Sequence, residues 1–283
     1  MDSSKSTNDA MVCFLSDAHL GSRVIADPEA HQREVVRLLG LMAEKAEVIC
    51  LLGDIFDFWY EYLWESGATL DNPPAGKKQF AGILKCLKRL TDSGIDVHYF
   101  IGNHDIWTFG WLEKVTGVHL HRTLWETEFY GKKVLMAHGD GLVPQDYLQS
   151  LPVEIQRKIK AFMRLRAFFH HPVPQFLFRL LPPRWGDNFG YEWARRSRQK
   201  EIDNPCPYKG ENKEELVLYA KEQELQGRHH DLYVFGHRHI ELDLELAGGS
   251  RVLVLGDCFR QWTYAQLDKN GNISMQYHET HTC

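Results

Sequence analysis

Short apolar runs that each end in a polar motif constrain the fold of this chain more than any other feature. In the first third, runs at 11–15, 47–52 and 97–101 alternate with stretches at 29–45 and 78–92 that suit helices. Strand–helix–strand alternation predicts a parallel sheet with its helices packed on one outer face.

The later part of the chain has a different rhythm. Short strands are expected at 127–130, 133–137, 232–235, 251–255 and 264–268, with turn residues between them. They predict a second, mixed sheet packed on the first. From 142 to about 212 Pro, Arg and aromatic residues dominate, which indicates a helical insertion. The expected fold class is α/β, with two mixed β-sheets packed as a sandwich, flanked by helices and carrying a helical cap.

Composition sets the broad class of the chain. It has 283 residues, of which 43% are hydrophobic and 25% charged, as is typical of a globular protein. No run of about 18 apolar residues occurs, so no membrane-spanning helix is expected. Residues 1–9 are polar and are expected to form a disordered tail ahead of a single domain over 10–283.

Charge and cysteine use narrow the cellular setting. The formal net charge of -5 argues against bulk nucleic-acid binding, which needs a basic footprint. The six cysteines are scattered and include no CxxC pair, so disulfides are not expected and a reducing cytoplasm is favoured.

Five polar motifs follow five of the expected strands. They are Asp17-Ala-His19, Gly53-Asp54, Gly102-Asn103-His104-Asp105, His138-Gly139-Asp140 and Gly236-His237-Arg238-His239. Ligands of α/β sheets bind in the crevice beyond the carboxyl ends of the strands, where these motifs would lie. Residues two apart in an extended segment point to one side, as Asp17 and His19 would.

The types of donor in these motifs indicate metal ions. Carboxylate, amide oxygen and imidazole without thiolate suit manganese, iron or zinc better than calcium. Seven candidate ligands are too many for one ion and suit two divalent ions that share a bridge; they are Asp17, His19, Asp54, Asn103, His138, His237 and His239. Two such ions can activate water and clamp phosphoryl oxygens. Each motif alone is a weak signal, because Asp and Gly are common in turns and His pairs are often structural. Five motifs in order are a strong signal.

The order DxH, GD, GNHD, HGD and GHxH resembles the calcineurin-like metallophosphoesterase superfamily, across roughly 12–257. The resemblance implies the αββα fold of that superfamily. It also implies one metal held by Asp17, His19, Asp54 and His239, and a second held by Asp54, Asn103, His138 and His237.

The resemblance further implies catalytic roles for two residues. His104 would lie beside the scissile phosphate, where it would protonate the leaving oxygen or stabilise developing charge. Asp105 would hold the His104 ring in place, although a turn cap is an alternative reading of Asp105. Asp57 also has two alternative roles: it would either support the loop after Asp54 or cap a helix.

The helical insertion is rich in basic and large apolar residues. Between 157 and 200 it contains eleven Lys or Arg residues and two acids, Asp187 and Glu192. Basic groups beside a broad apolar surface suit an anionic membrane face or an amphiphilic phosphate. The alternative is a helical cap that buries its apolar side on the sandwich and leaves a solvated basic face.

Longer segments resemble one branch of the superfamily. FLSDAHLGS, LLGDIFDFW, GNHDIW, AHGDGL, GENKE and GHRHIELDL are similar to the UDP-2,3-diacylglucosamine diphosphatase family of lipid A biosynthesis, in its Bacteroidetes-like form. The resemblance implies hydrolysis of the pyrophosphate of this nucleotide-lipid to 2,3-diacylglucosamine 1-phosphate (lipid X) and UMP. It also implies two divalent ions, with manganese as the usual metal, and peripheral binding to the cytoplasmic face of the inner membrane.

One position departs from the better-known branch of this family, which has Arg where this chain has His104. The candidates for substrate contact are Asn103, Arg195, Ser197, Arg198 and Lys209 for nucleotide or phosphate, and Asp146 for the sugar; apart from Asn103, each is equally consistent with a plain surface residue. Two other functions are considered: a soluble phosphatase or phosphodiesterase acting on a nucleotide or phosphoprotein, and a non-catalytic binding scaffold.

Overall fold

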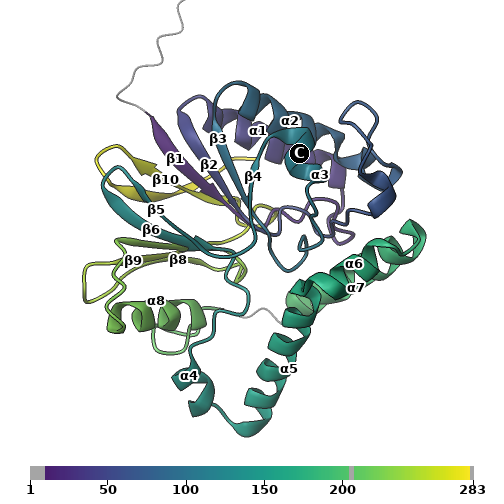
Figure 1. The fold of residues 1–283 in the computed structure, drawn as a ribbon. Coiled ribbons are helices and arrows are strands. Elements are labelled where there is room, and N and C mark those ends of the chain that lie inside the picture. The colour runs from purple at the N-terminus through teal and green to yellow at the C-terminus, as the bar shows by residue number, and fades with distance from the viewer. Residues whose placement is uncertain (1–9, 204–206, 281–283) are drawn as a thin grey trace, which may run out of the picture.

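The computed structural model describes residues 10–203 and 207–280, so the expected tail at 1–9 lies outside the described residues. Two mixed sheets lie face to face with helices on their outer sides, which confirms the predicted fold class (Figure 1). The first sheet has the order β11-β10-β1-β2-β3-β4, and the second has the order β5-β6-β7-β9-β8.

The first sheet is parallel through its centre. Its strands are β1 (Met11–Leu15), β2 (Ala46–Leu52), β3 (Asp96–Phe100), β4 (His119–His121), β10 (Thr263–Asp268) and β11 (Ile273–Tyr277). Strands β1 to β4 pair in parallel, and β10 runs antiparallel to β1. Three helices pack on the outer face of this sheet: α1 (Pro28–Ala43), α2 (Ala81–Asp92) and α3 (Trp111–Thr116). Two short 3-10 helices, Leu63–Glu65 and Ala75–Phe80, lie in the long connection after β2.

The second sheet is built mainly from the later part of the chain. Its strands are β5 (Trp125–Phe129), β6 (Lys132–Ala137), β7 (Leu232–Phe235), β8 (Glu241–Glu245) and β9 (Arg251–Leu255). Helix α8 (Glu215–Leu225) packs on its outer face. Strands β6, β7 and β9 are parallel, so their carboxyl ends lie at one edge.

Side-chain alternation along the strands builds two layers of core. In β1, Cys13 and Leu15 pack toward the outer helices, while Val12 and Phe14 pack between the sheets. This is the period of two that a strand buried on both faces requires. Three strands, β4, β8 and β11, were not predicted. Each of them is an edge strand of its sheet. Polar and partly exposed residues make up much of each strand, so the apolar pattern that would predict it is weak.

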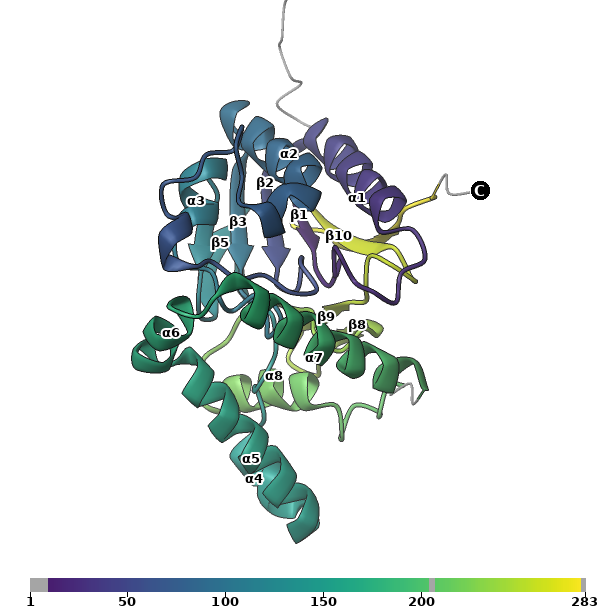
Figure 2. The same cartoon turned by 90° about the vertical axis from the view of Figure 1, so that its right-hand side faces the viewer.

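The predicted insertion is helical. It consists of α4 (Gln145–Ser150), α5 (Val153–His170), α6 (Pro172–Arg179) and α7 (Pro183–Asp203). Pro152, Pro172 and Pro183 stand at the starts of α5, α6 and α7, where a missing N–H is harmless and a fixed φ favours the first turn. Figure 2 shows α7 crossing the molecule between the α1–α3 side and α8, with α5 extending away. Within the described residues, no helix is long and apolar enough to span a bilayer.

Candidate metal centre

The polar motifs gather at one end of the sandwich. Asp17, Asp54 and Asn103 follow β1, β2 and β3 of the first sheet, and His138 and His237 follow β6 and β7 of the second. The carboxyl ends of parallel strands lie at one edge of each sheet, and both sheets present this edge to the same site.

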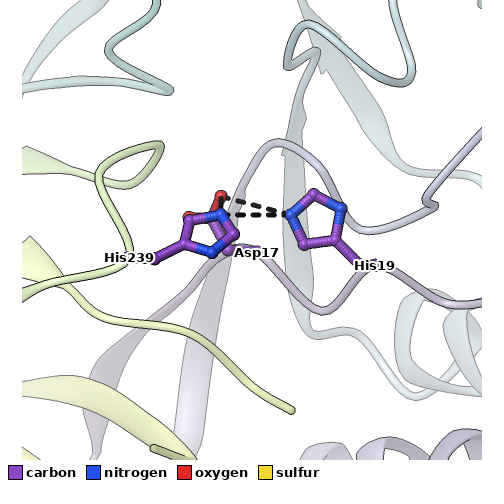
Figure 3. A group of neighbouring side chains, drawn as sticks. All are labelled: Asp17, His19 and His239. Atoms are coloured by element: carbon purple, nitrogen blue, oxygen red, sulfur yellow. Dashed lines mark hydrogen bonds and ion pairs between the residues drawn. The ribbon is translucent and has the colours of Figure 1, made fainter. Parts of the chain in front are cut away.

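A first cluster is formed by Asp17, His19 and His239 (Figure 3). His239 Nε2 lies 3.0 Å from Asp17 Oδ1 and 3.2 Å from His19 Nε2. Asp17 Oδ1 is buried, and beyond this ion-pair contact with His239 it makes no hydrogen bond with a described residue. Two imidazole nitrogens and an unsatisfied carboxylate oxygen that face one another fit a divalent cation.

A second cluster lies beside the first and shares Asp54 with it. His138 Nε2 is 3.3 Å from both Asp54 Oδ2 and Asn103 Oδ1. Asp54 Oδ2 is also 3.9 Å from His19 Nε2 of the first cluster. The His237 ring packs edge-on against His138, with centroids 5.1 Å apart. The Asp54 carboxylate therefore lies between the two clusters.

Hydrogen bonds from the backbone set the orientation of these imidazoles. His138 Nδ1 is 2.8 Å from the Leu52 carbonyl, which can only accept, so Nδ1 carries a proton and Nε2 faces Asp54. His19 Nδ1 lies 3.3 Å from Asp57 Oδ1, and Asp57 is buried. Carboxylates and carbonyls behind a metal-ligating imidazole are the usual outer shell of such sites. This contact favours the reading that Asp57 supports the site.

The local backbone explains why the motifs contain glycine. A Cβ on Gly102 would come within 2.1 Å of Asp54 Oδ1, and one on Gly236 within 2.5 Å of Asp17 Oδ2. Five candidate ligands themselves adopt positive φ: Asp17 (52°), His19 (45°), Asp54 (52°), His237 (67°) and His239 (50°). Few non-glycine residues adopt this conformation, and it often marks a functional site.

The electrostatics of the two clusters favour positive charge between them. Burial raises the pKa of Asp17 and of Asp54, but nearby imidazoles outweigh burial and hold both pKa values well below the usual range. Burial lowers the pKa of His138, yet the Asp54 carboxylate outweighs it and raises the pKa to about 10. The buried carboxylates thus stabilise a cation at this place, and the donor set suits metal ions.

His104 lies beside the clusters, but Asp105 does not orient it. The His104 ring donates from Nδ1 to the Asp57 carbonyl at 2.7 Å. Asp105 instead accepts from the Tyr99 hydroxyl (2.5 Å) and from the backbone N–H of Ile55 (3.1 Å). The expectation that Asp105 holds the His104 ring is therefore wrong. Asp105 joins the loops after β2 and β3 to each other.

Asn103 belongs to the second cluster, and of the remaining expected substrate residues only Arg198 reaches the clusters directly. From α7 it places Nη2 3.0 Å from His104 Nε2 and Nη1 3.2 Å from His239 Nε2. Burial lowers the pKa of His104 to about 4, and the Arg198 charge adds to this effect, so the ring is neutral at pH 7.

The other expected substrate residues are placed away from the clusters or beside them. Arg195 is exposed and pairs with Glu192 at 2.7 Å, while Ser197 and Asp146 are exposed and make no hydrogen bond with a described residue. Lys209 Nζ pairs with Glu215 at 2.7 Å.

An apolar cavity of about 540 Å³ opens beside His104, and the sequence did not reveal it. Its wall includes Phe58, Tyr60, Asn103, His104, Ile106, Trp107, Phe162, Leu165, Phe169, Phe178, Leu181 and Trp193. The aromatic residues of the insertion were the available signal, but which of them share a cavity depends on how α5, α6 and α7 pack. Trp107 contacts both Phe169 and Phe178, with ring centroids 5.3 and 5.1 Å apart.

Curated proteins resemble this chain along most of its length. A protein of Porphyromonas gingivalis named UDP-2,3-diacylglucosamine hydrolase is 34% identical over 267 residues, covering 91% of this chain and 94% of the relative. Proteins with the same name from Pseudomonas fluorescens Pf-5 and Serratia proteamaculans are each 26% identical. The first covers 92% of both chains, and the second covers 86% of this chain and 89% of the relative. No protein-family model matches the chain.

Solved structures give weaker similarities. An archaeal phosphodiesterase has 13% identity and a TM-score of 0.43, covering 94% of this chain and 98% of its own. Vacuolar protein sorting 29 from Cryptosporidium parvum has 13% identity and a TM-score of 0.39, covering 94% and 96%.

Proposed function

The chain belongs to the family of UDP-2,3-diacylglucosamine hydrolases, and from this membership we propose that it hydrolyses the pyrophosphate bond of UDP-2,3-diacylglucosamine. The products are 2,3-diacylglucosamine 1-phosphate (lipid X) and UMP. One observation carries the proposal: the buried cluster of Asp, Asn and His donors opens directly onto an apolar cavity of about 540 Å³. A phosphate site beside a space for acyl chains suits an amphiphilic phosphate ester.

Seven residues are proposed to hold two divalent ions, with manganese as the proposed metal. They are Asp17, His19, Asp54, Asn103, His138, His237 and His239. When bound, the ions would supply Lewis acidity and lower the pKa of a water molecule. Asp54 is the proposed bridging ligand because its carboxylate lies between the two clusters.

Arg198 and His104 are proposed to contact the pyrophosphate, together with Asn103. The Arg198 guanidinium lies between His104 and His239, and guanidinium groups bind phosphate oxygens in pairs. His104 carries its proton on Nδ1, toward Asp57, so its Nε2 accepts a hydrogen bond. Arg198 thus supplies the positive charge that offsets the leaving phosphate, and His104 positions Arg198.

The reaction joins water oxygen to one phosphorus and breaks that phosphorus's bond to the bridging oxygen. The bridging oxygen leaves with the electron pair on the other phosphate. The apolar cavity would hold acyl chains, with Phe169 and Phe178 against Trp107 forming much of its wall. Burying each methylene of such a chain stabilises the complex by about 0.8 kcal/mol.

The helical insertion is also proposed to bind the cytoplasmic face of an anionic inner membrane. Large apolar side chains on α5 and α6 are exposed: Leu165 (50%), Phe168 (51%), Phe176 (53%) and Leu177 (58%). Basic residues at 157, 158, 160 and 164 stand on the same α5 helix. Amphipathic helices with this composition lie in the membrane interface.

The test is incubation of manganese-loaded protein with UDP-2,3-diacylglucosamine, with UMP and the lipid monophosphate measured by mass spectrometry. Both products are expected in equal amounts. A generic chromogenic diester and the water-soluble UDP-N-acetylglucosamine are the comparison substrates. Faster turnover of the water-soluble esters would favour a soluble phosphatase or phosphodiesterase. No turnover of any ester by a metal-loaded sample would favour a non-catalytic scaffold.

A further inference from the structure

A second cavity, of about 350 Å³, reaches the metal centre from another side. We name it the polar cleft. Its wall includes Gly139, Leu142, Lys158, Lys209, Glu215 and His237. His237 is a candidate metal ligand, whereas the apolar cavity meets the centre at Asn103 and His104. The centre therefore opens onto two cavities.

Helix α5 lines both cavities, and Phe162 belongs to both walls. Lys158 and Ile159 of this helix line the polar cleft, whereas Leu165 and Phe169 line the apolar cavity. Residues three and four apart lie on one face of a helix, so a single face of α5 passes from the polar cleft at Lys158 to the apolar cavity at Phe169.

One ion pair holds helix α5 against the candidate metal centre. Arg166 of α5 donates to the Asp140 carboxylate, in the loop that carries His138. Burial raises the pKa of Asp140, but His138 and Arg166 together outweigh it and lower the pKa. A Cβ on Gly141 would come within 3.1 Å of Arg166 Cδ, so the helix packs closely on this loop. The loop that carries the candidate ligand His138 thus also sets the position of α5 beside the two cavities.

Three charged side chains of the chain line the polar cleft beside His237: Lys158, Lys209 and Glu215, with Arg238 next to them, whereas the wall of the apolar cavity is mostly aromatic and aliphatic, with Arg166 as its charged residue. Lys158 is exposed and forms no ion pair with a described residue. Lys209 is held by Glu215 at 2.7 and 2.9 Å, and Arg238 by the fully buried Glu214 at 2.6 Å. The volume of the cleft falls in the range of about 300–1,000 Å³ that is usual for small-molecule sites.

We propose that the polar cleft binds the nucleoside of the substrate, its base and ribose, while the acyl chains lie further along α5 in the apolar cavity. The inference rests on the proposed function. The pyrophosphate of the substrate, held at the candidate metal centre, joins an apolar lipid half to a polar nucleoside half. Each half of the substrate needs its own cavity. Base and ribose carry groups that are costly to bury without partners, which favours the polar cleft over the mostly apolar cavity. Lys158 and Lys209 supply donors for their oxygens.

Product inhibition tests the two halves separately. The manganese-loaded enzyme is assayed with UMP, inorganic phosphate and lipid X as inhibitors. Lys158→Ala removes a donor, and Leu142→Trp fills the cleft. Each is expected to raise the UMP inhibition constant by about tenfold. Inhibition by inorganic phosphate, which needs only the centre, should change by less than about twofold in both variants.

A matched variant about two turns further along the same face of α5 is the control. Leu165→Trp narrows the apolar cavity and is expected to weaken inhibition by lipid X while leaving UMP inhibition unchanged. Lys158→Arg should retain UMP inhibition. Unchanged UMP inhibition in both folded cleft variants would overturn the inference. Calorimetric titration of UMP into wild type, Lys158→Ala and Leu142→Trp gives the same comparison without turnover. A wild-type enzyme that leaves the nucleotide-lipid intact would instead refute the proposed function.

Discussion

At the residue scale, the candidate ligands adopt backbone conformations that most residues avoid. Asp17, His19, Asp54, His237 and His239 all have positive φ, and each such residue costs the fold on the order of 1 kcal/mol. Surrounding contacts keep them there. The His237 N–H donates to Asp17 Oδ2 at 2.9 Å, and the His104 N–H donates to Asp54 Oδ1 at 2.8 Å. Backbone hydrogen bonds thus help to fix the positions of the candidate donors.

Asp54→Asn is expected to lower hydrolysis by more than about 100-fold, because the bridging charge between the two clusters is lost. Asn tolerates the left-handed backbone at this position, so the protein should fold. Metal content measured by plasma mass spectrometry should fall below that of the wild type. A folded Asp54→Asn variant with full metal content and full activity would disprove the ligand assignment.

Arg198→Ala is expected to lower kcat/KM by about 100-fold with metal content unchanged, since its guanidinium contacts imidazole edges and would meet phosphate oxygens. Arg198→Lys should restore only part of the lost kcat/KM, because an ammonium group cannot make the paired contact with phosphate oxygens. The control is Arg195→Ala, since Arg195 lies on the same helix but is exposed and paired with Glu192. The kcat/KM of this variant should stay within about twofold of the wild-type value. Equal losses in both Ala variants would contradict the role of Arg198.

At the scale of elements, one buried carboxylate joins a loop to a helix. Glu61 is 1% exposed and accepts from the backbone N–H groups of Trp111 (2.9 Å) and Leu112 (3.0 Å) at the start of α3. It also accepts from the N–H of Phe109 and the indole of Trp59. A carboxylate at a helix N-terminus satisfies donors that the helix leaves open. Glu61 thereby holds the loop of the apolar cavity against the first sheet.

Glu61→Gln is expected to lower the free energy of unfolding by about 2 kcal/mol, because charge-assisted hydrogen bonds to several N–H groups are replaced by weaker ones. Urea unfolding followed by circular dichroism measures the change. Glu113→Gln, near the start of the same helix, is the comparison variant. A Glu61→Gln protein as stable as the wild type would show that the cap contributes little.

The β3–β4 edge carries a histidine cluster that makes stability depend on pH. His98 and His121 are hydrogen-bonded at 2.9 Å, and the His121 ring stacks on Phe100 and Trp125. Burial, with added repulsion from His98 and His119, lowers the pKa of His121 from 6.5 to about 4. Between these values the unfolded chain binds a proton that the folded chain does not, so stability falls as pH falls.

His121→Phe retains the ring stack and removes the titrating group. The wild type is expected to lose on the order of 1 kcal/mol of unfolding free energy from this group between pH 6.5 and 4, reduced by its partial exposure. The variant should show a smaller loss in urea titrations across this range. Parallel pH profiles of the two proteins would exclude the cluster as a source of the dependence.

At the scale of the whole molecule, the helical insertion covers the metal centre with one face and leaves apolar residues exposed on others. Phe169 and Phe178 pack on Trp107, whereas Phe168 and Phe176 are about half exposed. One insertion therefore provides both the wall of the apolar cavity and a surface suited to lipid.

Phe168→Asp combined with Phe176→Asp is expected to reduce binding to vesicles that contain anionic lipid by about tenfold or more, because apolar area and charge attraction are both lost. Vesicle co-sedimentation measures binding. Leu225→Asp, at the end of α8 and 88% exposed, is the control and should leave binding unchanged. Equal binding of the double variant and the wild type would contradict a membrane surface on the insertion.

The sequence alone determined the donor set and the class of fold. Motifs at strand ends converge because parallel strands place their carboxyl ends at one edge, and this follows from chain direction alone. The seven candidate ligands, from Asp17 to His239, could be named for that reason, and all seven lie in or beside the two clusters. The alternation of apolar runs with helices predicted the two-sheet architecture in the same way.

Only the tertiary structure decided which insertion residues face the centre. Arg195, Ser197 and Arg198 are neighbours in the sequence, yet Arg198 alone is buried against His104. The rotation of α7 sets this outcome, and it depends on contacts such as Gly190 against Phe58 that no local pattern encodes. Tertiary packing likewise decides which groups bond to Asp105 and which residues line the two cavities. Local periodicity predicts elements, whereas long-range packing determines which side chains meet.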